Sequence, residues 1–305
     1  MPRVSVILTC FNHLEYLPRA VQSVREQTYT EVEVIAIDDG STDGTRLWLS
    51  ENCVDWTLIF NESNMGTYGS LNRAIERSSG EFIAILNDDD FWGVEKLSSQ
   101  VERFDQNPKI ALCHTGGRFV DERGEALSGA PLGFEYPKTS SGWILPELIY
   151  HNKIIPSSSM MRRSVLDRVG LFDPSFFGCG DWHLFLRIAV GNEVAHVDDD
   201  LLAYRVHGSN ASLNLEKMDE DDARIRTWIA SHAESWLNEF PQNRQLFEAL
   251  AHNFACLGTI RTMQGDARAG RAAFARSIKM LPFRFKSYLR WLATLLPRKT
   301  FTKMR

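Results

Sequence analysis

Three consecutive aspartates, Asp88, Asp89 and Asp90, directly follow the apolar run FIAIL at residues 82–86. A continuous apolar run of this length is typical of a strand buried on both faces of a parallel sheet. In open α/β sheets, ligands bind outside the carboxyl ends of such strands. Adjacent carboxylates repel one another unless a cation or hydrogen-bond donors hold them, and Mg²⁺ and Mn²⁺ prefer oxygen ligands. The residues therefore predict a divalent-metal site at the end of this strand.

A second acidic pair, Asp38 and Asp39, ends the strand pattern EVEVIAIDDG at residues 31–40. In a dinucleotide-binding fold an acid at this position holds a ribose. The first turn, TCFNHLEYL at residues 9–17, contains no glycine, so neither G-x-G-x-x-G nor a Walker A loop is present. The pattern favours a nucleotide that contacts Asp39 through its base or ribose, and whose phosphates a metal holds near residues 88–90. Asp38 has the alternative task of capping the turn after its strand.

The elements that would position these acids alternate along the first 110 residues. Period-two and continuous apolar patterns predict strands at 3–9, 31–40, 56–61 and 81–87. Capping residues and helical spacing predict helices at 14–28, 41–52, 64–80 and 94–108. This order is typical of an α/β fold with a parallel sheet and helices on both faces.

The rest of the chain is less regular. We expect a strand near 111–125, a helix at 181–191 and one or two strands in 193–208, with the acidic run at 196–202 forming a turn. No strand signal remains after residue 215, and two helical patterns at 246–265 and 266–282 resemble one tetratricopeptide-like hairpin. His183 and His196 are interpreted as structural or surface residues.

Composition excludes several classes of protein. Apolar residues make up 44% and charged residues 24% of the 305 residues, as in globular proteins, and the net charge of -5 argues against a nucleic-acid partner. Five scattered cysteines without a CxxC pair indicate reduced thiols in a cytoplasmic protein rather than disulfides or a zinc site. The early strand pattern predicts no signal peptide, and no apolar run approaches the roughly 18 residues that span a bilayer.

Six blocks of the chain, in order, resemble the family-2 glycosyltransferases, which are inverting enzymes. They read VSVILTCFN, IDDGSTDGT, NMGTYGSLNRAIERSSGEFIAILNDDDFW, PSSSMMRRSVLDRVGLFD, GDWHLFLRIA and YRVHGSNAS. The resemblance covers residues 1–212 and implies the family's A-type nucleotide-sugar-binding fold, a Rossmann-like, mostly parallel sheet flanked by helices. We then expect a glycosyltransferase domain at 1–212 and a helical extension at 213–305.

The resemblance also implies roles for individual residues. Those that would contact the nucleotide are Thr9, Phe11, Asp39, Asn72 and Asp88, with Asp39 at the base and Asp88 at the ribose. Asp89 would bind a metal, Mn²⁺ or Mg²⁺, that bridges the two phosphates, and His207 would complete the metal or pyrophosphate site. Asp181 would be the general base.

Simpler interpretations of some of these residues stay open. Asp90 is expected to cap the following helix rather than to bind the metal. Asp181 could be a helix N-cap, which does not exclude catalysis, and His207 could be a hydrogen-bonded structural histidine.

The chain departs from the family's usual residues at three positions. Asn87 stands where an aspartate is frequent, Leu71 where an arginine is frequent, and Gly180 replaces the glutamate that usually precedes the catalytic aspartate. The change at Gly180 affects the region that would bind the acceptor.

The expected reaction is inverting transfer of a sugar from a nucleoside-diphosphate sugar, with UDP favoured by its frequency in the family, to a hydroxyl of a glycan or lipid-linked acceptor. Surface-polysaccharide or glycoconjugate synthesis is the expected setting. Two alternatives are a sugar nucleotidyltransferase, which usually has a Gly-rich basic loop after its first strand, and a non-catalytic sugar-nucleotide-binding or membrane scaffold protein.

The last 27 residues carry eight Lys or Arg and no acid, so the remainder of the chain has a net charge of -13. Within 282–305, apolar Phe285, Leu289, Leu292 and Leu296 recur at helical spacing among basic residues. One interpretation is a helix packed on the preceding hairpin with its basic face in solvent. The favoured one is a peripheral helix on an anionic membrane, at the inner face of the cell membrane, with Tyr288 and Trp291 at the interface.

Overall fold

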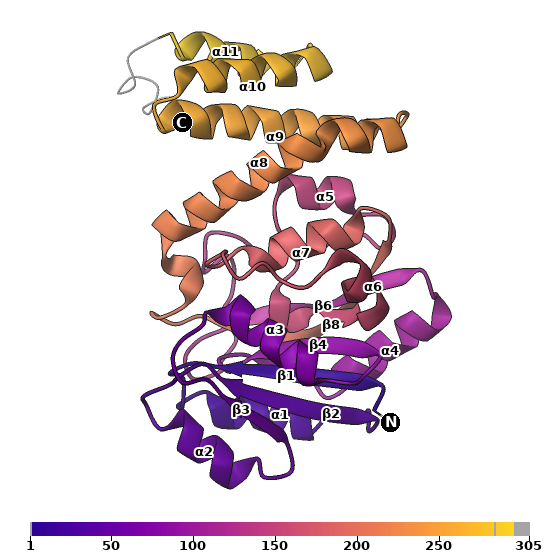
Figure 1. Ribbon diagram of the computed structural model, residues 1–305, viewed down its shortest axis with the longest axis vertical. Coiled ribbons are helices and arrows are strands. Elements are labelled where there is room, and N and C mark those ends of the chain that lie inside the picture. The colour runs from indigo at the N-terminus through magenta and orange to yellow at the C-terminus, as the bar shows by residue number, and fades with distance from the viewer. Residues whose placement is uncertain (1, 284, 296–305) are drawn as a thin grey trace. The chain divides into compact units, whose positions relative to one another are not determined.

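The computed structural model describes residues 2–283 and 285–295, and its chain divides into two compact units (Figure 1). The first unit contains Met1–Ile144 and Lys153–Asn214, and the second contains Leu145–Asn152 and Leu215–Arg305. The second unit therefore includes a short segment from the middle of the chain, which the sequence did not indicate.

One eight-stranded sheet forms the centre of the first unit, with the strand order β3-β2-β1-β4-β7-β6-β8-β5. The strands β1 (Val4–Cys10), β2 (Val32–Asp38), β3 (Thr57–Phe60) and β4 (Phe82–Asn87) are parallel to one another. All seven residues of β1 are buried, as are the first five of β4. The expected Rossmann-like arrangement is confirmed, because continuous β-branched and apolar runs suit strands that are covered on both faces.

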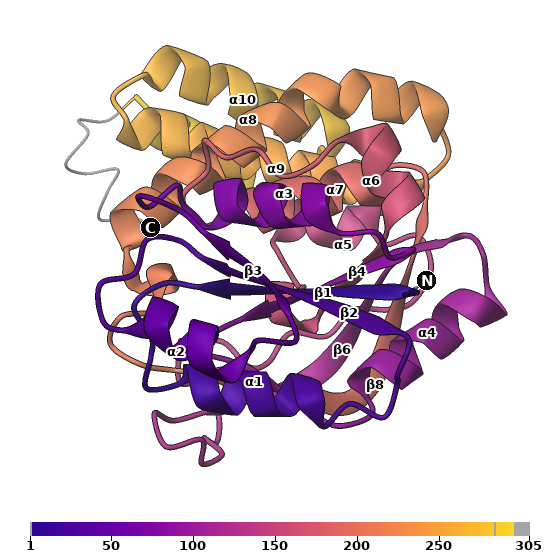
Figure 2. The same ribbon diagram turned by 60° about the horizontal axis from the view of Figure 1, so that its bottom comes forward.

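Helices cover both faces of this sheet (Figure 2). On one face lie α1 (Leu17–Arg25), α2 (Thr45–Asn52) and α4 (Lys96–Gln106), whose apolar side chains share a core with alternate residues of β1 and β4. The helices α3 (Thr67–Arg77) and α7 (Gly180–Ala189) lie over the opposite face (Figure 2). The predicted helices therefore exist, and their packing leaves the carboxyl ends of the parallel strands at one edge.

The remaining strands extend the sheet. The three-residue strand β7 (Met160–Arg162) pairs antiparallel with β4 and β6 (Ile110–Val120), and β5 (Phe91–Trp92) pairs antiparallel with β8 (Glu193–Arg205). Around them lie α6 (Arg163–Val169) and the 3₁₀ turns η1 (Pro156–Ser158) and η2 (Ala211–Leu213).

The acidic run at 196–202 lies inside β8, so the predicted turn is wrong. The pairing of β8 with β6 shifts register beside Gly116, and the exposed residues Asp198 and Asp199 bulge from the ladder. A Cβ at Gly116 would lie 2.9 Å from the carbonyl oxygen of Asp198. The glycine on the partner strand therefore permits this bulge. In the same two strands His196 stacks on His114, with ring centroids 4.6 Å apart, which confirms its structural interpretation.

The second unit is helical. It contains α5 (Leu145–Tyr150), α8 (Leu215–Glu239), α9 (Arg244–Met263), α10 (Ala267–Met280) and α11 (Phe285–Ala293). The predicted hairpin is confirmed: α9 and α10 are joined at Gly265, and Asp266 caps α10 by accepting from the backbone N–H of Ala269 (2.9 Å). Within the described residues, no helix has both the length and the apolar character that crossing a bilayer requires.

Candidate functional site

The carboxyl ends of β1, β2 and β4 bring the predicted acids to one edge of the sheet. The register pairs Thr9 with Asn87 and Cys10 with Asp38, so the residues that follow β2 and β4 flank the end of β1. The backbone N–H groups of Asp39 and Asp88 donate to carbonyl oxygens of β1, at Cys10 (2.9 Å) and Thr9 (3.0 Å). These bonds continue the ladder by one residue and fix where the two acidic side chains begin.

Asp39 is almost fully buried, and one of its oxygens is held in place. Oδ1 accepts from Asn61 Nδ2 (2.7 Å) and from the backbone N–H of Met65 (2.8 Å). Among the described residues no donor lies within hydrogen-bond distance of Oδ2. One oxygen of a rigid carboxylate is thus left for a further donor.

Asp38 has a structural task. Its Oδ1 accepts from the backbone N–H of Ser41 (3.1 Å), and its Oδ2 lies 3.3 Å from Arg46 Nε. The interpretation that Asp38 caps the turn after its strand is confirmed.

Asp88 holds the loop that follows β1. Its Oδ2 accepts from the backbone N–H of Phe11 (2.8 Å), and its Oδ1 lies 3.0 Å from His13 Nδ1. Burial lowers the pKa of His13, but the hydrogen bond and charge of Asp88 outweigh it and raise the pKa to about 9. Sequence reasoning missed His13, because only its contact with Asp88 in space marks it.

Asp89 and His207 lie together, and Asp89 has an unsatisfied polar atom. Asp89 Oδ2 lies 3.1 Å from His207 Nε2, and the buried Oδ1 has no hydrogen-bond partner among the described residues. The ring of His207 is buried against those of His13 and Tyr16, each with its centroid 5.0 Å away, and its Nδ1 lies 2.8 Å from Ser209 Oγ. The predicted pair of Asp89 and His207 is therefore together in space.

The pair of Asp89 and His207 could supply part of the ligands of a divalent cation. Within the described chain no group of three or more His, Cys, Asp or Glu side chains could hold a metal. Mg²⁺ is commonly bound by one or two protein carboxylates, with water and substrate phosphates completing the coordination. A buried carboxylate oxygen without a partner, next to an imidazole nitrogen, provides the protein's share of such a site.

Asp90 does not cap a helix, so that expectation is wrong. The next helix, α4, begins six residues further on at Lys96, with Glu95 at its N-cap. Asp90 Oδ1 instead accepts from the backbone N–H of Arg205 (3.0 Å), which joins the end of β4 to the end of β8. Burial raises the pKa of Asp90 well above its usual range, and the neighbouring charge of Asp89 acts in the same direction.

Asp181 lies in the first turn of α7, and the N-cap is Cys179, so the N-cap interpretation is wrong. Its carboxylate is buried, and Oδ1 accepts from the hydroxyl of Tyr68 (3.2 Å). Gly180 explains this contact, because a Cβ there would lie 2.7 Å from the ring of Tyr68. Tyr68 therefore fills space beside the position where the family usually has a glutamate.

Tyr204 of β8 lies within electrostatic reach of both groups of acids. Burial raises its pKa, and the charges of Asp90, Asp89 and Asp181 raise it further. The charges of Asp181 and of the acids after β4 therefore both act on Tyr204, although these acids come from distant segments of the chain.

The other predicted residues differ in how they relate to this group. Thr9 donates to Asn87 Oδ1 (3.0 Å), and the side chain of Phe11 is 40% exposed beside the backbone bond to Asp88. The side chain of Asn72 forms its hydrogen bonds with another segment of the chain. Its Nδ2 donates to the carbonyl oxygen of Phe172 (2.8 Å), and its Oδ1 accepts from the N–H of the same residue (3.0 Å). A nucleotide contact of Asn72 stays a prediction.

The fold and these strand-end acids define the class of A-type glycosyltransferases. The family model described as "Glycosyl transferase family 2" matches residues 5–170. The chain belongs to glycosyl transferase family 2, as its sequence motifs predicted. It is 28% identical over 253 residues to an uncharacterised glycosyltransferase of Nostoc sp., covering 78% of this chain and 75% of that protein. Several other curated relatives are matched over only about a third of their own length.

Solved structures have the same fold. Staphylococcus aureus TarS (residues 1–349) in complex with UDP-GlcNAc is 18% identical with a TM-score of 0.61, covering 95% of this chain and 92% of that one. The mannosyltransferase PcManGT of Pyrobaculum calidifontis, in complex with GDP-Man and Mn²⁺, is 20% identical with a TM-score of 0.55, covering 99% and 84%.

Proposed function

We propose that this glycosyltransferase moves a sugar, with inversion, from a nucleoside-diphosphate sugar to a hydroxyl of an acceptor, using a divalent cation bound by Asp89 and His207. The observation that carries the proposal is the buried Asp89 Oδ1, which has no partner among the described residues, on a carboxylate whose Oδ2 lies 3.1 Å from His207 Nε2. When bound there, Mn²⁺ or Mg²⁺ would stabilise the negative charge that grows on the leaving diphosphate.

The nucleoside would contact the residues after β1 and β2. Asp39 Oδ2 accepts from a base N–H, the exposed ring of Phe11 contacts the base, and Thr9 lies beside them. Asp88 orders the loop that carries Phe11 and lies toward the ribose. We propose UDP as the nucleotide, which the binding of UDP-GlcNAc by TarS supports.

Asp181 would accept the proton of the attacking hydroxyl. A general base must be held in one orientation, and typically contributes roughly 10²–10⁴-fold to the rate. Burial in the first turn of α7 and the hydrogen bond from Tyr68 give Asp181 that fixed orientation. The base and the diphosphate must act on opposite sides of the sugar, which agrees with their origin in separate segments of the chain.

The proposal is tested with Asp89→Asn, which keeps the side chain's size but removes its charge. Nucleotide sugars are screened by thermal shift with and without Mn²⁺, and donor hydrolysis or transfer is then measured. We expect a Mn²⁺-dependent shift with UDP in the native protein and its loss in the variant, together with a drop in rate of at least about 10²-fold. Asp198→Asn, in the exposed bulge of β8, is the matched control and should behave like the native protein. Full activity in EDTA, or in Asp89→Asn, would exclude the proposed metal site.

We further propose that the acceptor is a glycan or a lipid-linked glycan in surface-polysaccharide synthesis, and that the protein works at the inner face of the cell membrane. The support comes from α11, on which Phe285, Leu289 and Leu292 are 72%, 62% and 53% exposed beside basic residues. An acceptor carried on lipid would be reached from that position.

A further inference from the structure

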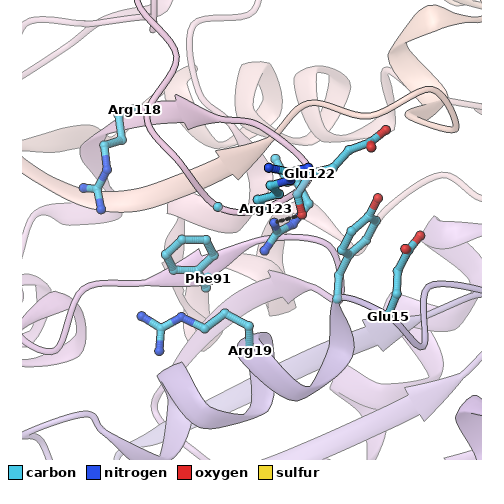
Figure 3. A pocket seen from close by; sticks show the side chains of 9 residues that line it. Glu15, Arg19, Phe91, Arg118, Glu122 and Arg123 are labelled. Carbon is cyan, nitrogen blue, oxygen red and sulfur yellow. Dashed lines mark hydrogen bonds between the residues drawn. The ribbon is translucent and has the colours of Figure 1, made fainter.

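Figure 3 shows a pocket of about 430 Å³. Two of its lining residues, Tyr16 and Arg205, neighbour His207 and the backbone of Asp89. Ligand pockets typically have volumes of roughly 300–1,000 Å³. This one is formed by the start of α1, by β5, by the end of β6 and by the turn that follows it. Its lining residues are Glu15, Tyr16, Arg19, Phe91, Arg118, Glu122, Arg123, Gly124 and Arg205. The sequence did not indicate this pocket, and the proposed donor site does not use its charged residues.

The most informative residue of the pocket is Arg205, which is only 3% exposed. Its Nε donates to the carbonyl oxygen of Asp89 (2.8 Å), and its Nη1 donates to the carbonyl oxygens of Asp121 (3.2 Å) and Glu122 (2.7 Å). Among the described residues, no carboxylate forms an ion pair with this guanidinium, and no acceptor lies within hydrogen-bond distance of Nη2. A buried charge without a counter-charge is unfavourable. Arg205 therefore offers a ligand the donors of Nη2 and a charge that no carboxylate pairs directly.

Two further arginines, Arg118 and Arg123, line the pocket without being engaged elsewhere. Neither guanidinium has a hydrogen bond or an ion pair with the described residues, and both side chains are exposed. A fourth arginine, Arg19, lies over the ring of Phe91, with its Cζ 4.8 Å from the centroid, and its Nη1 is 3.6 Å from a carboxylate oxygen of Glu26. Figure 3 shows Arg19 and Arg118 on either side of Phe91. Four arginines face two glutamates, so positive charge is in excess.

One wall of the pocket is shared with the candidate metal site. The Cζ of Arg205 lies 4.6 Å from the centroid of the Tyr16 ring, and the centroid of the His207 ring lies 5.0 Å from that of Tyr16. A group bound in the pocket would therefore contact Tyr16 and Arg205, which also neighbour His207 and the backbone of Asp89.

We propose that this pocket binds a phosphate or carboxylate group carried on a sugar, separately from the nucleotide donor. Planar guanidinium groups form paired hydrogen bonds with both anions, and the aromatic rings and glutamates of the lining provide contacts for a sugar body. The anion has two possible sources: an acidic unit of the acceptor glycan, which rests on the proposed function, or a free sugar phosphate that binds as an effector.

The test measures binding to the full chain directly, by calorimetry with glucose 6-phosphate, galacturonate and neutral galactose. It uses Arg118→Gln/Arg123→Gln, which changes two exposed residues whose guanidinium groups form no hydrogen bond or ion pair with the described residues. The matched control is Arg77→Gln/Arg103→Gln, which removes two exposed arginines outside the pocket. We expect saturable binding of both anions by the native protein and by the control, a loss of about tenfold or more in the pocket variant, and no binding of galactose.

Each titration is repeated with saturating UDP and Mn²⁺. Anion binding that persists supports a separate site, whereas displacement by the nucleotide would assign the anion to the donor site and overturn the proposal while leaving the proposed transfer reaction intact. Equal binding in the pocket variant and the native protein, or no saturable anion binding, would also overturn it. Tetragalacturonate that binds about tenfold or more tightly than galacturonate identifies a glycan chain as the source, and equal affinities identify a free small molecule.

Discussion

Asp88, Asp89 and Asp90 are adjacent in the chain, yet each contacts a different part of the molecule. Asp88 holds the loop after β1, Asp90 holds the end of β8, and Asp89 lies beside His207. Asp89 Oδ1 and Asp90 Oδ2 are both buried and have no hydrogen-bond partner among the described residues. The sequence could place three acids at a strand end, because the apolar run before them is unambiguous. It could not assign their tasks, because these depend on partners 77 and 115 residues away. His13 was missed for the same reason.

The assignment of Asp181 as the base is tested by Asp181→Asn. The amide keeps the shape of the side chain but accepts no proton at neutral pH. We expect the transfer rate to fall by at least about 10²-fold while donor affinity stays near the native value. Rates and donor affinities are measured separately by steady-state kinetics and thermal shift. If donor affinity collapses instead, Asp181 belongs to the nucleotide site and the base lies elsewhere.

Tyr68 is expected to position that base. Tyr68→Phe removes the hydrogen bond to Asp181 Oδ1 and retains the ring that packs beside Gly180 and stacks on Phe172, 5.4 Å away. We expect kcat to fall about tenfold, because the variant loses a hydrogen bond to the charged base Asp181. The KM for the donor should change little, because no proposed donor contact is removed. Tyr29→Phe, whose hydroxyl bonds Glu31 at the surface, serves as the control. An unchanged kcat would show that Asp181 is held in place by other contacts.

At the scale of elements, prediction succeeded where one segment carries its own signal. The strand β4 begins with a continuous apolar run, β1 and β2 have largely apolar, β-branched sequences that begin with a period-two pattern, and the hairpin of α9 and α10 has its own cap at Asp266. Prediction failed where the structure of a segment depends on a neighbouring strand. The bulge of β8 requires glycine on β6, and the three residues of β7 form a strand only because β4 and β6 lie on both sides.

The helix α4 contains a buried charge whose effect on stability can be measured. Lys96 is fully buried at the start of α4, with its Nζ 2.7 Å from Gln100 Oε1 and 4.1 Å from the centroid of the Trp92 ring. Burial lowers the pKa of Lys96 to about 7, whereas in an unfolded chain it is about 10.4. Between these values the unfolded state binds the proton more tightly, so the free energy of unfolding should rise with pH by up to about 1.4 kcal/mol per pH unit.

Urea denaturation at pH 7, 8 and 9 tests this for the native protein and Lys96→Met. The native protein should gain stability relative to the variant as the pH rises, and the variant should be the more stable of the two at pH 7. Lys109→Met, at an exposed position, provides the control for the loss of a lysine. Native and Lys96→Met stabilities that change in parallel with pH would contradict the depressed pKa.

At the scale of the whole molecule, the last helix was expected either to pack on the preceding hairpin or to lie on an anionic membrane. The described part of α11 bears on both interpretations. Ser287 and Ala293 are the buried residues of α11, and Trp291 packs on a core that contains Phe274 of α10. The helix therefore does pack on the hairpin, and Trp291 faces that core rather than an outer interface. The packing does not bury Phe285, Leu289 and Leu292, so its exposed face is apolar as well as basic. Arg284, Leu296 and the basic residues from Arg298 to Arg305 lie outside the described residues.

Membrane binding by α11 is tested with Leu289→Ser/Leu292→Ser, which changes two exposed residues and keeps the buried Ser287 and Ala293. The full chain should co-sediment with vesicles of phosphatidylcholine and phosphatidylglycerol at low salt, because apolar side chains enter the interface and each nearby basic residue adds about 1 kcal/mol. The variant should lose this binding and keep the UDP-dependent thermal shift. Leu47→Ser/Val54→Ser, which changes two residues that are 64% and 79% exposed in the first unit, should bind vesicles as the native protein does. Binding should also weaken as salt is raised, since salt screens the anionic surface. If the native protein does not bind these vesicles at low salt, the membrane prediction is wrong, and α11 is a packed helix with an exposed apolar face.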